Sequence, residues 1–228
     1  MAYTAIDDPE AYFQVKTYTG NGSTQSITLD GDTDMQPDIV WFKIRSDADY
    51  HALYDAVRGA TKRIHPDLTS AEGTVTDGLT SFNSDGFSMG DDNGINKDTE
   101  TYVAWNWKES ATSGVDIVAY TGTGSAKTEA HSLSAAPKMV IVKTKATTGE
   151  WITWHTGIDI QAKLSLNTTD GIYNPGTGLY WNSTAPTSSV FSVGTSGSLN
   201  GDSVTYIAYL FADVQGFSKF GSYTGNGN

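Results

Sequence analysis

Short runs of apolar residues, separated by glycine, asparagine and aspartate, fill the chain from residue 13 onward. Alternation of apolar and polar positions is typical of a strand with one buried face, and a continuous apolar run is typical of a strand buried on both faces. Residues 13–18 alternate, whereas residues 39–44 are almost entirely apolar. The sequence therefore predicts an all-β protein in which residues 39–44 form a central strand.

The other predicted strands show the same patterns and are bounded by turn-forming residues. In the first half of the chain they are residues 26–29, 50–55, 62–65, 79–82, 87–89 and 101–108, with a hairpin turn at 84–86 and a short turn at 55–58. In the second half they are residues 115–120, 138–144, 151–155, 163–166, 190–193, 205–212 and 218–223. Helix is predicted only before residue 13, as a single turn in which Asp8 is the N-cap and Pro9 the first helical residue.

A five-residue motif occurs three times and indicates an internal repeat. Tyr-Thr-Gly-Asn-Gly stands at residues 18–22, Tyr-Thr-Gly-Thr-Gly at residues 120–124, and the first form returns at residues 223–227. A β-favouring tyrosine followed by two closely spaced glycines predicts a strand that ends in a tight turn. We name these three segments the first, second and third turn motif.

Further matches extend the repeat over the whole chain. Residues 37–43 match residues 137–143 at an offset of 100, and four other pairs match at an offset of 104, so one small insertion separates the copies. These pairs are His51 and Asp55 with His155 and Asp159, residues 87–90 with 191–194, Asn96 with Asn200, and residues 102–105 with 206–209.

The repeat predicts two tandem antiparallel β-sandwiches, jelly-roll-like and about 100 residues each, with the same strand order. Residues 1–12 form an N-terminal arm outside the repeat, residues 13–108 form copy 1, and residues 115–228 form copy 2. The short linker at residues 109–114 predicts that the copies share an interface. The strand at residues 218–223 corresponds to the opening strand of a further copy, and we expect it to finish the sheet of copy 2 or to pair with a neighbouring chain.

Composition excludes several classes of protein. The formal net charge of −12 argues against nucleic-acid binding, because contact with phosphates requires a basic surface. The chain has no cysteine, so neither disulfides nor thiolate metal sites are expected. No apolar run is long enough to insert into a membrane, and the first eight residues lack the basic start and apolar core of a signal peptide.

Catalytic and metal-binding patterns are weak. His51 with Asp55 is the best catalytic-looking pair, but no Gly-x-Ser-x-Gly elbow supplies a nucleophile, and recurrence in both copies favours a structural role. A hydrolase that depends on His155 remains an alternative. The acidic clusters at residues 30–34 and 91–93 suggest calcium, yet Ile95 stands where a third ligand is needed and turns also require aspartate. We predict no catalytic residue, no cofactor and no metal.

Aromatic residues suggest a second function class, a carbohydrate-binding lectin-like module. Trp41, Trp105 and Trp107 lie in strand patterns and are expected in the core. Five aromatic residues lie in the less regular part of copy 2 and are the candidate glycan-contact or host-contact residues: Trp151, Trp154, Tyr173, Tyr180 and Trp181.

Several stretches together resemble one known family. They are the turn motifs and residues 37–43, 57–62, 79–87 and 102–108, and the resemblance spans nearly the whole chain. The family is the repeated β-domain of virion structural proteins from marine tailed bacteriophages, described as tail-fibre or surface proteins.

The resemblance implies a non-enzymatic protein on the surface of the virion, as a tail fibre or spike, an adhesin or a capsid decoration. Its partners would be other virion proteins, further copies of itself in a homo-oligomer, and a host surface glycan. The arm would anchor the protein to the virion, with Tyr3, Ile6, Pro9 and Tyr12 as the candidate anchor residues. Copy 2 would then face the host.

Overall fold

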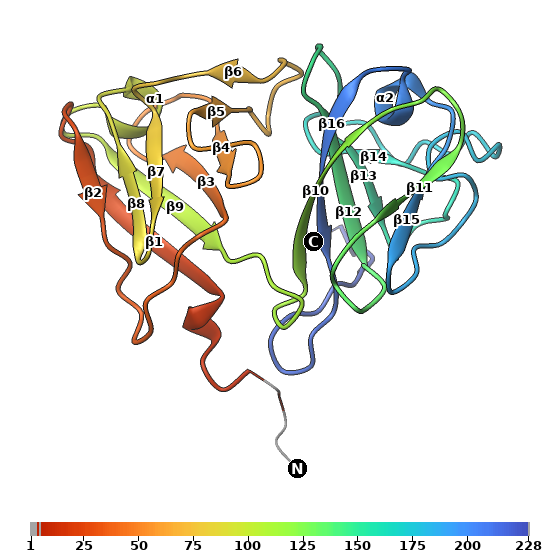
Figure 1. The fold of residues 1–228 in the computed structure, drawn as a ribbon, viewed down its shortest axis with the longest axis horizontal. Helices are drawn as coiled ribbons and strands as arrows, with labels where there is room; N and C mark the ends of the chain where they lie inside the picture. The colour runs from red at the N-terminus through yellow and green to blue at the C-terminus, as the bar shows by residue number, and fades with distance from the viewer. Residues whose placement is uncertain (1–3, 5, 228) are drawn as a thin grey trace.

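The computed structural model describes residue 4 and residues 6–227 and is built from antiparallel sheets. Copy 1 and copy 2 lie side by side (Figure 1). The elements up to the end of copy 1 are η1 (Pro9–Ala11), β1 (Phe13–Thr19), β2 (Gln25–Ile27), β3 (Ile39–Ile44), β4 (Ala52–Asp55), β5 (Lys62–Arg63), β6 (Gly73–Thr74), β7 (Leu79–Asn83), β8 (Gly86–Met89), α1 (Asn93–Asn96) and β9 (Thr101–Trp107). Those of copy 2 are β10 (Val115–Thr121), β11 (Lys127–Ala130), β12 (Met139–Thr144), β13 (Ile152–His155), β14 (Leu164–Ser165), β15 (Val190–Val193), α2 (Gly197–Asn200) and β16 (Thr205–Phe211).

The large sheets of the two copies have the same order of their first four strands. The large sheet of copy 1 has the strand order β1-β9-β3-β4, and that of copy 2 has the order β10-β16-β12-β13 followed by β14. A smaller sheet, β2-β8-β7 in copy 1 and β11-β15 in copy 2, belongs to each copy. The prediction of an all-β protein with antiparallel, sandwich-like architecture is confirmed.

Each copy has a core of its own. In copy 1, Val40 and Phe42 of the large sheet join Phe87 and Met89 of the small sheet in one buried cluster. Copy 2 has the corresponding cluster, which includes Val140 and Val142. These side chains occupy alternate positions of β3 and β12, so the remaining positions of both strands lie on the opposite face.

That opposite face is also buried, because the two large sheets pack against each other. A third cluster combines residues of both copies, and we name it the inter-copy layer: Ile39, Trp41, Leu53, Ile64 and Trp107 of copy 1 with Val115, Ile117, Met139, Ile141, Trp151, Ile207, Tyr209 and Phe211 of copy 2. The layer explains why residues 39–44 are apolar at almost every position, since each face of β3 is covered. The expectation of a central strand buried on both sides is confirmed.

The structure corrects one part of the repeat alignment. Asp55 lies opposite Ile39 in copy 1, and His155 lies opposite Met139 in copy 2, so Asp55 and His155 are the equivalent residues. The offset is therefore still 100 at β4 and β13, and it reaches 104 only by β8 and β15. The predicted correspondence of His51 and Asp55 with His155 and Asp159 is wrong, because the insertion lies after these residues and not before them.

The first turn motif is held by the segment around α1. The Tyr18 hydroxyl donates a hydrogen bond of 2.6 Å to the carbonyl of Ile95, and its ring stacks on Tyr102 with 5.3 Å between centroids. The amide of Asn21 donates to the Asn96 side-chain oxygen, at 2.9 Å. The last glycine of the motif donates to the Asn96 backbone carbonyl, also at 2.9 Å. The motif is thus a docking segment for the last strand of a copy and for the short helix before that strand.

The second turn motif docks in the same way. The Tyr120 hydroxyl donates to the Leu199 carbonyl at 2.8 Å, and its ring stacks on Tyr206 with 5.1 Å between centroids. The amide of Thr123 donates to the Asn200 side-chain oxygen at 2.9 Å. Asn96 and Asn200 are both fully buried, so each is the central acceptor of its docking site.

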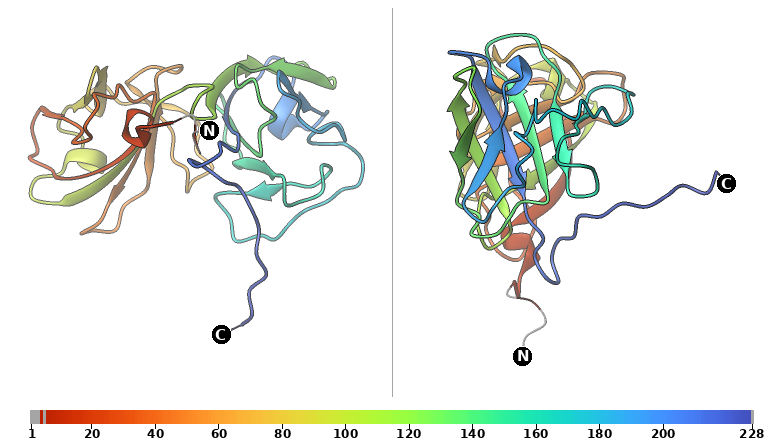
Figure 2. Two further views of the ribbon diagram at one scale, coloured as in Figure 1. Left: turned by 90° about the horizontal axis from the view of Figure 1, so that it is seen from below. Right: turned by 90° about the vertical axis from the view of Figure 1, so that its right-hand side faces the viewer.

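The third turn motif is not docked, and the strand predicted at residues 218–223 does not form. Val214 and Ser218 form one isolated bridge, and from Gly221 the chain runs away from the body of the protein (Figure 2). The physical reason is that the last strand of each copy already has a paired strand on both sides. β9 lies between β1 and β3, and β16 lies between β10 and β12, so neither has an edge to which residues 218–223 could be added.

The N-terminal arm packs against the body. Pro9 begins the predicted helical turn, and the Asp8 side chain caps it by accepting from the Glu10 amide. Ile6 is buried, and the ring of Tyr12 meets that of Phe217 edge-on at 6.3 Å. Tyr3 lies outside the described residues. The role of this arm as a virion anchor stays a prediction.

Candidate functional site

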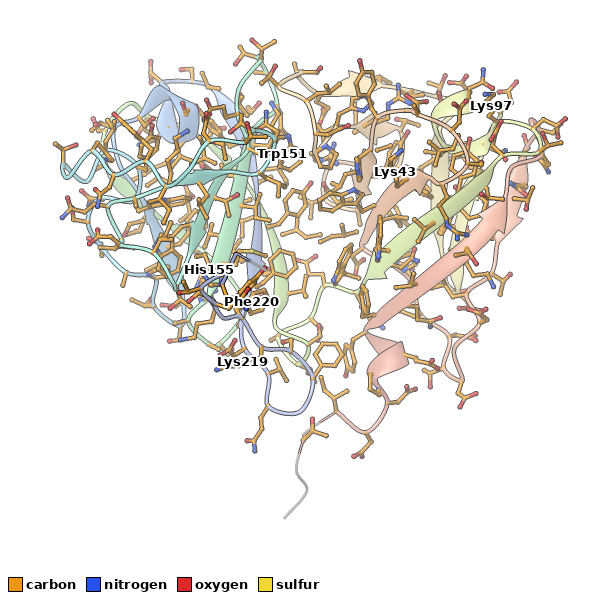
Figure 3. All side chains as sticks on the ribbon, turned by 180° about the vertical axis from the view of Figure 1, so that it is seen from behind. Lys43, Lys97, Trp151, His155, Lys219 and Phe220 are labelled. Atoms are coloured by element: carbon orange, nitrogen blue, oxygen red, sulfur yellow. The ribbon has the colours of Figure 1, made fainter. Side chains whose placement is uncertain are left out.

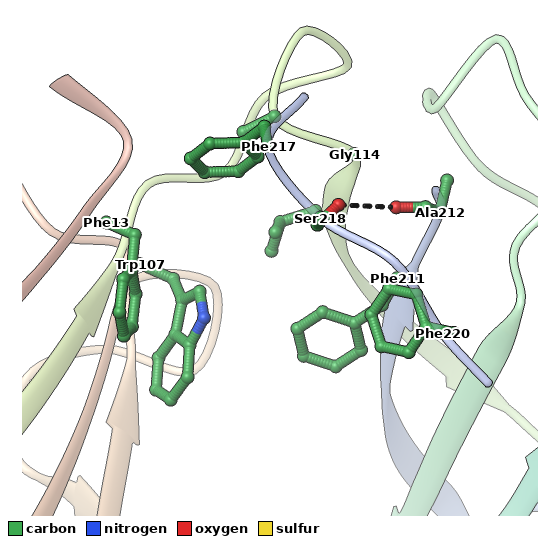
Figure 4. Close-up of a pocket in the computed structure, with 10 residues that line it drawn as sticks. Phe13, Trp107, Gly114, Phe211, Ala212, Phe217, Ser218 and Phe220 are labelled. Atoms are coloured by element: carbon green, nitrogen blue, oxygen red, sulfur yellow. Dashed lines mark hydrogen bonds between the residues drawn. The ribbon is translucent and has the colours of Figure 1, made fainter. Parts of the chain in front are cut away.

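An apolar cleft opens along the edge of the inter-copy layer. A cavity of about 180 Å³ lies beside the linker and has Phe13, Trp107, Phe211, Phe217 and Phe220 among its lining residues (Figure 4). A neighbouring cavity of about 230 Å³ shares three of these aromatic residues and is also lined by Trp151. The cleft offers ring faces and almost no hydrogen-bonding groups, so it can accept an apolar group but cannot perform acid–base chemistry.

Trp151 lines the second cavity and lies between the two copies (Figure 3). Its indole N–H donates to the backbone carbonyls of His65 at 2.9 Å and Leu68 at 3.2 Å, both in copy 1. Its ring stacks on Tyr209 with 6.3 Å between centroids. Trp151 is therefore a structural residue of the inter-copy layer, and its prediction as a surface contact is wrong.

Three more of the predicted contact residues are also buried. Trp154 and Trp181 lie in the core of copy 2, and Trp181 donates to the carbonyl of Ala162 at 3.0 Å. Tyr180 is only 8% exposed. Trp154, Tyr180 and Trp181 therefore expose too little ring surface to stack on a ligand. Only Tyr173 is exposed, at 52%, and it contacts the edge of Tyr180.

The candidate His–Asp pair is not assembled. His51 accepts a hydrogen bond from the indole N–H of Trp41, and burial lowers the pKa of its imidazole. Asp55 instead accepts from the Arg58 side chain and from the Tyr209 hydroxyl, both at 2.5 Å. Asp55 and Arg58 thus form a buried ion pair within copy 1, and the Tyr209 hydroxyl of copy 2 adds a hydrogen bond to the same carboxylate.

The second predicted pair is separated in the same way. His155 accepts a hydrogen bond from the Gly157 amide, and Asp159 accepts one from the Gln161 amide. Phe220 lies beside His155, with 6.5 Å between ring centroids (Figure 3). Each residue therefore fixes a local turn.

A polar pocket lies at one end of copy 1. It has a volume of about 220 Å³ and is lined by Tyr50, Arg63, His65 and Asp92, among others. Arg63 donates to Asp92 at 2.8 Å, and the ring of Tyr50, 54% exposed, meets His65 edge-on at 5.9 Å. An exposed ring beside groups that can donate and accept hydrogen bonds is suited to a small polyhydroxylated ligand.

Copy 2 has a similar arrangement at the equivalent place. Lys163 directly precedes β14 and is the repeat equivalent of Arg63, since the offset between the copies is 100 at this point. It forms an ion pair with Glu150. The hydrogen bond from Lys163 lowers the pKa of the Glu150 carboxyl. Lys163, Tyr173 and Tyr180 line a more open pocket of about 510 Å³. Both copies thus have a paired cation at the equivalent position, Arg63 and Lys163, whereas the exposed tyrosine beside it comes from a different position in each copy.

Three carboxyl groups meet at the linker. The amide of Glu109 donates to Asp38, the side chain of Glu109 accepts from the Ile117 amide, and Asp116 accepts from the Ser132 amide. Burial, and then a hydrogen bond with Asp116, raise the pKa of Glu109 to about 7. This group is therefore expected to change its protonation within the neutral range.

Lys143 is a buried ammonium group whose hydrogen bonds within the described part of the chain go to backbone carbonyls and not to a carboxylate. Its Nζ donates to the backbone carbonyls of Thr69 at 3.3 Å and Thr144 at 2.9 Å, so it joins copy 2 to a loop of copy 1. Burial lowers its pKa to about 8. The equivalent Lys43 of copy 1 is partly exposed and donates to the Asp49 carbonyl (Figure 3).

The acidic clusters predicted as alternative calcium sites serve other roles. Asp30 pairs with Lys16 at 3.0 Å, and Asp92 pairs with Arg63. Among the residues that the structure describes, no group of three or more histidine, cysteine, aspartate or glutamate side chains is placed to hold a metal ion. Within the same residues, no helix has the length and hydropathy to traverse a bilayer.

Comparison with known proteins places the chain in a family. No curated protein and no solved structure matches it. One family model, described as "Domain of unknown function (DUF7483)", matches residues 8–228. The match covers both copies, the linker and the third turn motif. The chain therefore belongs to the DUF7483 family.

Proposed function

We propose that this protein is a non-enzymatic structural component of the surface of a bacteriophage particle: a tail fibre or spike, an adhesin or a capsid decoration that acts as a homo-oligomer. The observation that carries the proposal is the inter-copy layer, which joins the two sandwiches over their large sheets. A continuous apolar core makes the pair a stiff building block, as a part of a particle requires. The resemblance of the repeated motifs to virion β-domains supports the same conclusion.

The proposal is tested on particles of the phage that encodes the chain. We expect gradient-purified virions to contain the protein at a fixed number of copies per particle, measured by quantitative mass spectrometry against the major capsid protein. Antibodies against the purified protein should label one defined part of the particle in electron micrographs. A protein that is abundant in infected cells but absent from washed virions would contradict the proposal.

A second candidate function is carbohydrate binding, and the polar pocket of each copy favours it. Tyr50 and Tyr173 offer exposed rings next to Arg63 and Lys163, which are both held by carboxylates. Stacking of a ring on a sugar face combined with hydrogen bonds to hydroxyl groups is the expected recognition chemistry. With one pocket in each copy, two weak contacts on one surface would combine into a higher avidity.

A glycan array measures this second function directly. We expect Tyr50→Ala and Tyr173→Ala each to weaken binding strongly, and the double variant to abolish it. Val57→Ala removes an apolar side chain that is 44% exposed and lies outside both pockets, and it serves as the control. Binding that survives the double variant would show that neither pocket is the glycan site.

A further inference from the structure

We propose that the third turn motif docks onto copy 1 of a second molecule of this chain, where residues 221–227 take the place of residues 16–22 beside β9. The partner is therefore a further copy of the same protein, and the interaction is an exchange of one strand end. This proposal does not depend on the assignment to a virion, since it rests on the docking geometry of the motif alone.

The same sequence docks twice within the chain, and the docking contacts are the same both times. In each case the tyrosine of the motif stacks on a tyrosine of β9 or β16. The amide of the second glycine of the motif donates to the backbone carbonyl of a buried asparagine. Tyr223 belongs to a third copy of this motif, yet its side chain is 95% exposed. A segment with a defined docking site and an exposed key residue is expected to bind such a site elsewhere.

Copy 1 is the better acceptor because its own motif has the same five residues. Residues 223–227 repeat residues 18–22 without a change, whereas the second turn motif has Thr123 in place of the asparagine. In copy 1, the side-chain oxygen of Asn21 accepts from the Ser23 amide at 2.9 Å and from the Asn96 side chain at 3.3 Å. Asn226 of the third turn motif corresponds to Asn21 and has the same amide side chain.

Copy 1 also holds its opening strand less tightly than copy 2 does. On β10, Val115 and Ile117 are buried in the inter-copy layer, so this strand cannot leave without opening the interface. On β1, the corresponding outward side chain of Val15 is 47% exposed. The end of β1 can therefore be replaced while the inter-copy layer stays closed.

No acceptor site within the same molecule is open. Residues 18–22 occupy the site beside β9, and residues 120–124 occupy the site beside β16. The third turn motif begins just beyond Phe220, which is held against Phe211 with 6.0 Å between ring centroids. The segment that follows leaves the body of the protein (Figure 2), so that the exposed Tyr223 can meet another molecule.

The repeat alignment fixes the register of the exchanged strand. Tyr18 lies opposite Tyr102 and Thr19 lies opposite Thr101 in the antiparallel pair. The exchange therefore places Tyr223 opposite Tyr102 and Thr224 opposite Thr101 of the second molecule. Donor and acceptor are different surfaces, so the contact is heterologous and can add molecules head to tail.

The absence of cysteine makes disulfide trapping a clean test. In the full chain carrying Thr224→Cys and Thr101→Cys, we expect oxidation at high protein concentration to give linked dimers and larger species on non-reducing gels. Tyr223→Ala in this background should reduce the linked fraction about tenfold or more, because it removes a ring stack and a hydrogen bond. The matched control Tyr173→Ala should leave the fraction unchanged.

Three outcomes of this test would overturn the proposal. They are a disulfide within one chain only, linkage as efficient with Thr169→Cys in place of Thr224→Cys, and linkage that is insensitive to Tyr223→Ala. Hydrogen exchange on the unmodified protein gives an independent measurement. We expect residues 221–227 to gain protection as the concentration rises while residues 16–22 lose it, and protection that does not depend on concentration would refute the exchange.

Discussion

Replacing Tyr209 by phenylalanine removes a single hydroxyl from the inter-copy layer. That hydroxyl donates to the Asp55 carboxylate at 2.5 Å, and both groups are buried, so water does not replace the lost bond. A hydrogen bond to a charged group contributes about 1.5–3 kcal/mol. Asp55 keeps its ion pair with Arg58, which places the expected loss at the lower end, about 1.5–2 kcal/mol.

Equilibrium unfolding in urea is the assay, with thermal unfolding beside it. For a chain of this length the expected loss lowers the melting temperature by about 3–8 °C. A double-mutant cycle with Asp55→Asn isolates the energy of this one contact, which we expect at about 1–2 kcal/mol. Tyr206→Phe is the matched control: its hydroxyl bonds only within copy 2, to the carbonyl of Gly197 and the amide of Gly201, so the same cycle should give no coupling to Asp55.

The reasoning would be refuted by a change smaller than about 0.3 kcal/mol together with no coupling to Asp55, since sites without shared partners add within about that margin. This hydrogen bond between the copies would then contribute nothing, and their interface would depend on apolar packing and on its other hydrogen bonds, such as those of Trp151.

Three further predictions follow from buried groups and close contacts. The lowered pKa of Lys143 means that the folded protein binds its proton less strongly than the unfolded chain does, so stability should rise by about 2–3 kcal/mol between pH 8 and 10.5, and Lys143→Met should remove this rise in urea titrations. The pKa of Glu109, raised to about 7, has the opposite consequence: stability should fall by about 1–2 kcal/mol as the pH rises from 4.5 to 7, and Glu109→Gln should flatten the curve. Gly122→Ala would place a Cβ 2.2 Å from the carbonyl oxygen of Gly201 and should cost about 3 kcal/mol or more, whereas Gly171→Ala, where no atom lies within 4 Å, should cost little in calorimetry.

The strands of the large sheets could be predicted from sequence because their patterns are local. The continuous apolar run of β3 and the alternation in β1 are direct consequences of which faces are covered. The turn motif and its period predicted the relation between the copies, since the first two of the three near-identical segments dock in the same way. By contrast, α1 and α2 are four residues long, which is too short for a helical period to appear.

The burial of aromatic side chains could not be predicted, because it depends on partners far away in the chain. Trp151 is surrounded by turn-forming residues, which suggested a surface position, but its indole bonds to carbonyls more than 80 residues earlier. A similar limit applies to residues 218–223. Their sequence is that of a strand, and whether it pairs is decided by the free sides of β9 and β16 and not by the residues themselves.

The His–Asp alignment failed for another reason. An offset of 104 fits most of the later matches, and His155 happens to lie at this distance from His51. Backbone register distinguishes the true equivalents, since Ile39 pairs with Asp55 just as Met139 pairs with His155. A chance match of two common polar residues carries little weight against a strand register.

The inter-copy layer also has a consequence for synthesis on the ribosome. All strands of copy 1 have left the ribosome once β9 emerges. The inter-copy layer over Ile39, Trp41 and Leu53 is complete only after β16 has also emerged. At elongation rates of about 5–20 residues per second, the roughly 100 intervening residues take on the order of 5–20 s. During this interval the nascent chain presents a broad apolar sheet to the solvent, which is the kind of surface that chaperones bind and that neighbouring nascent chains on a polysome can join.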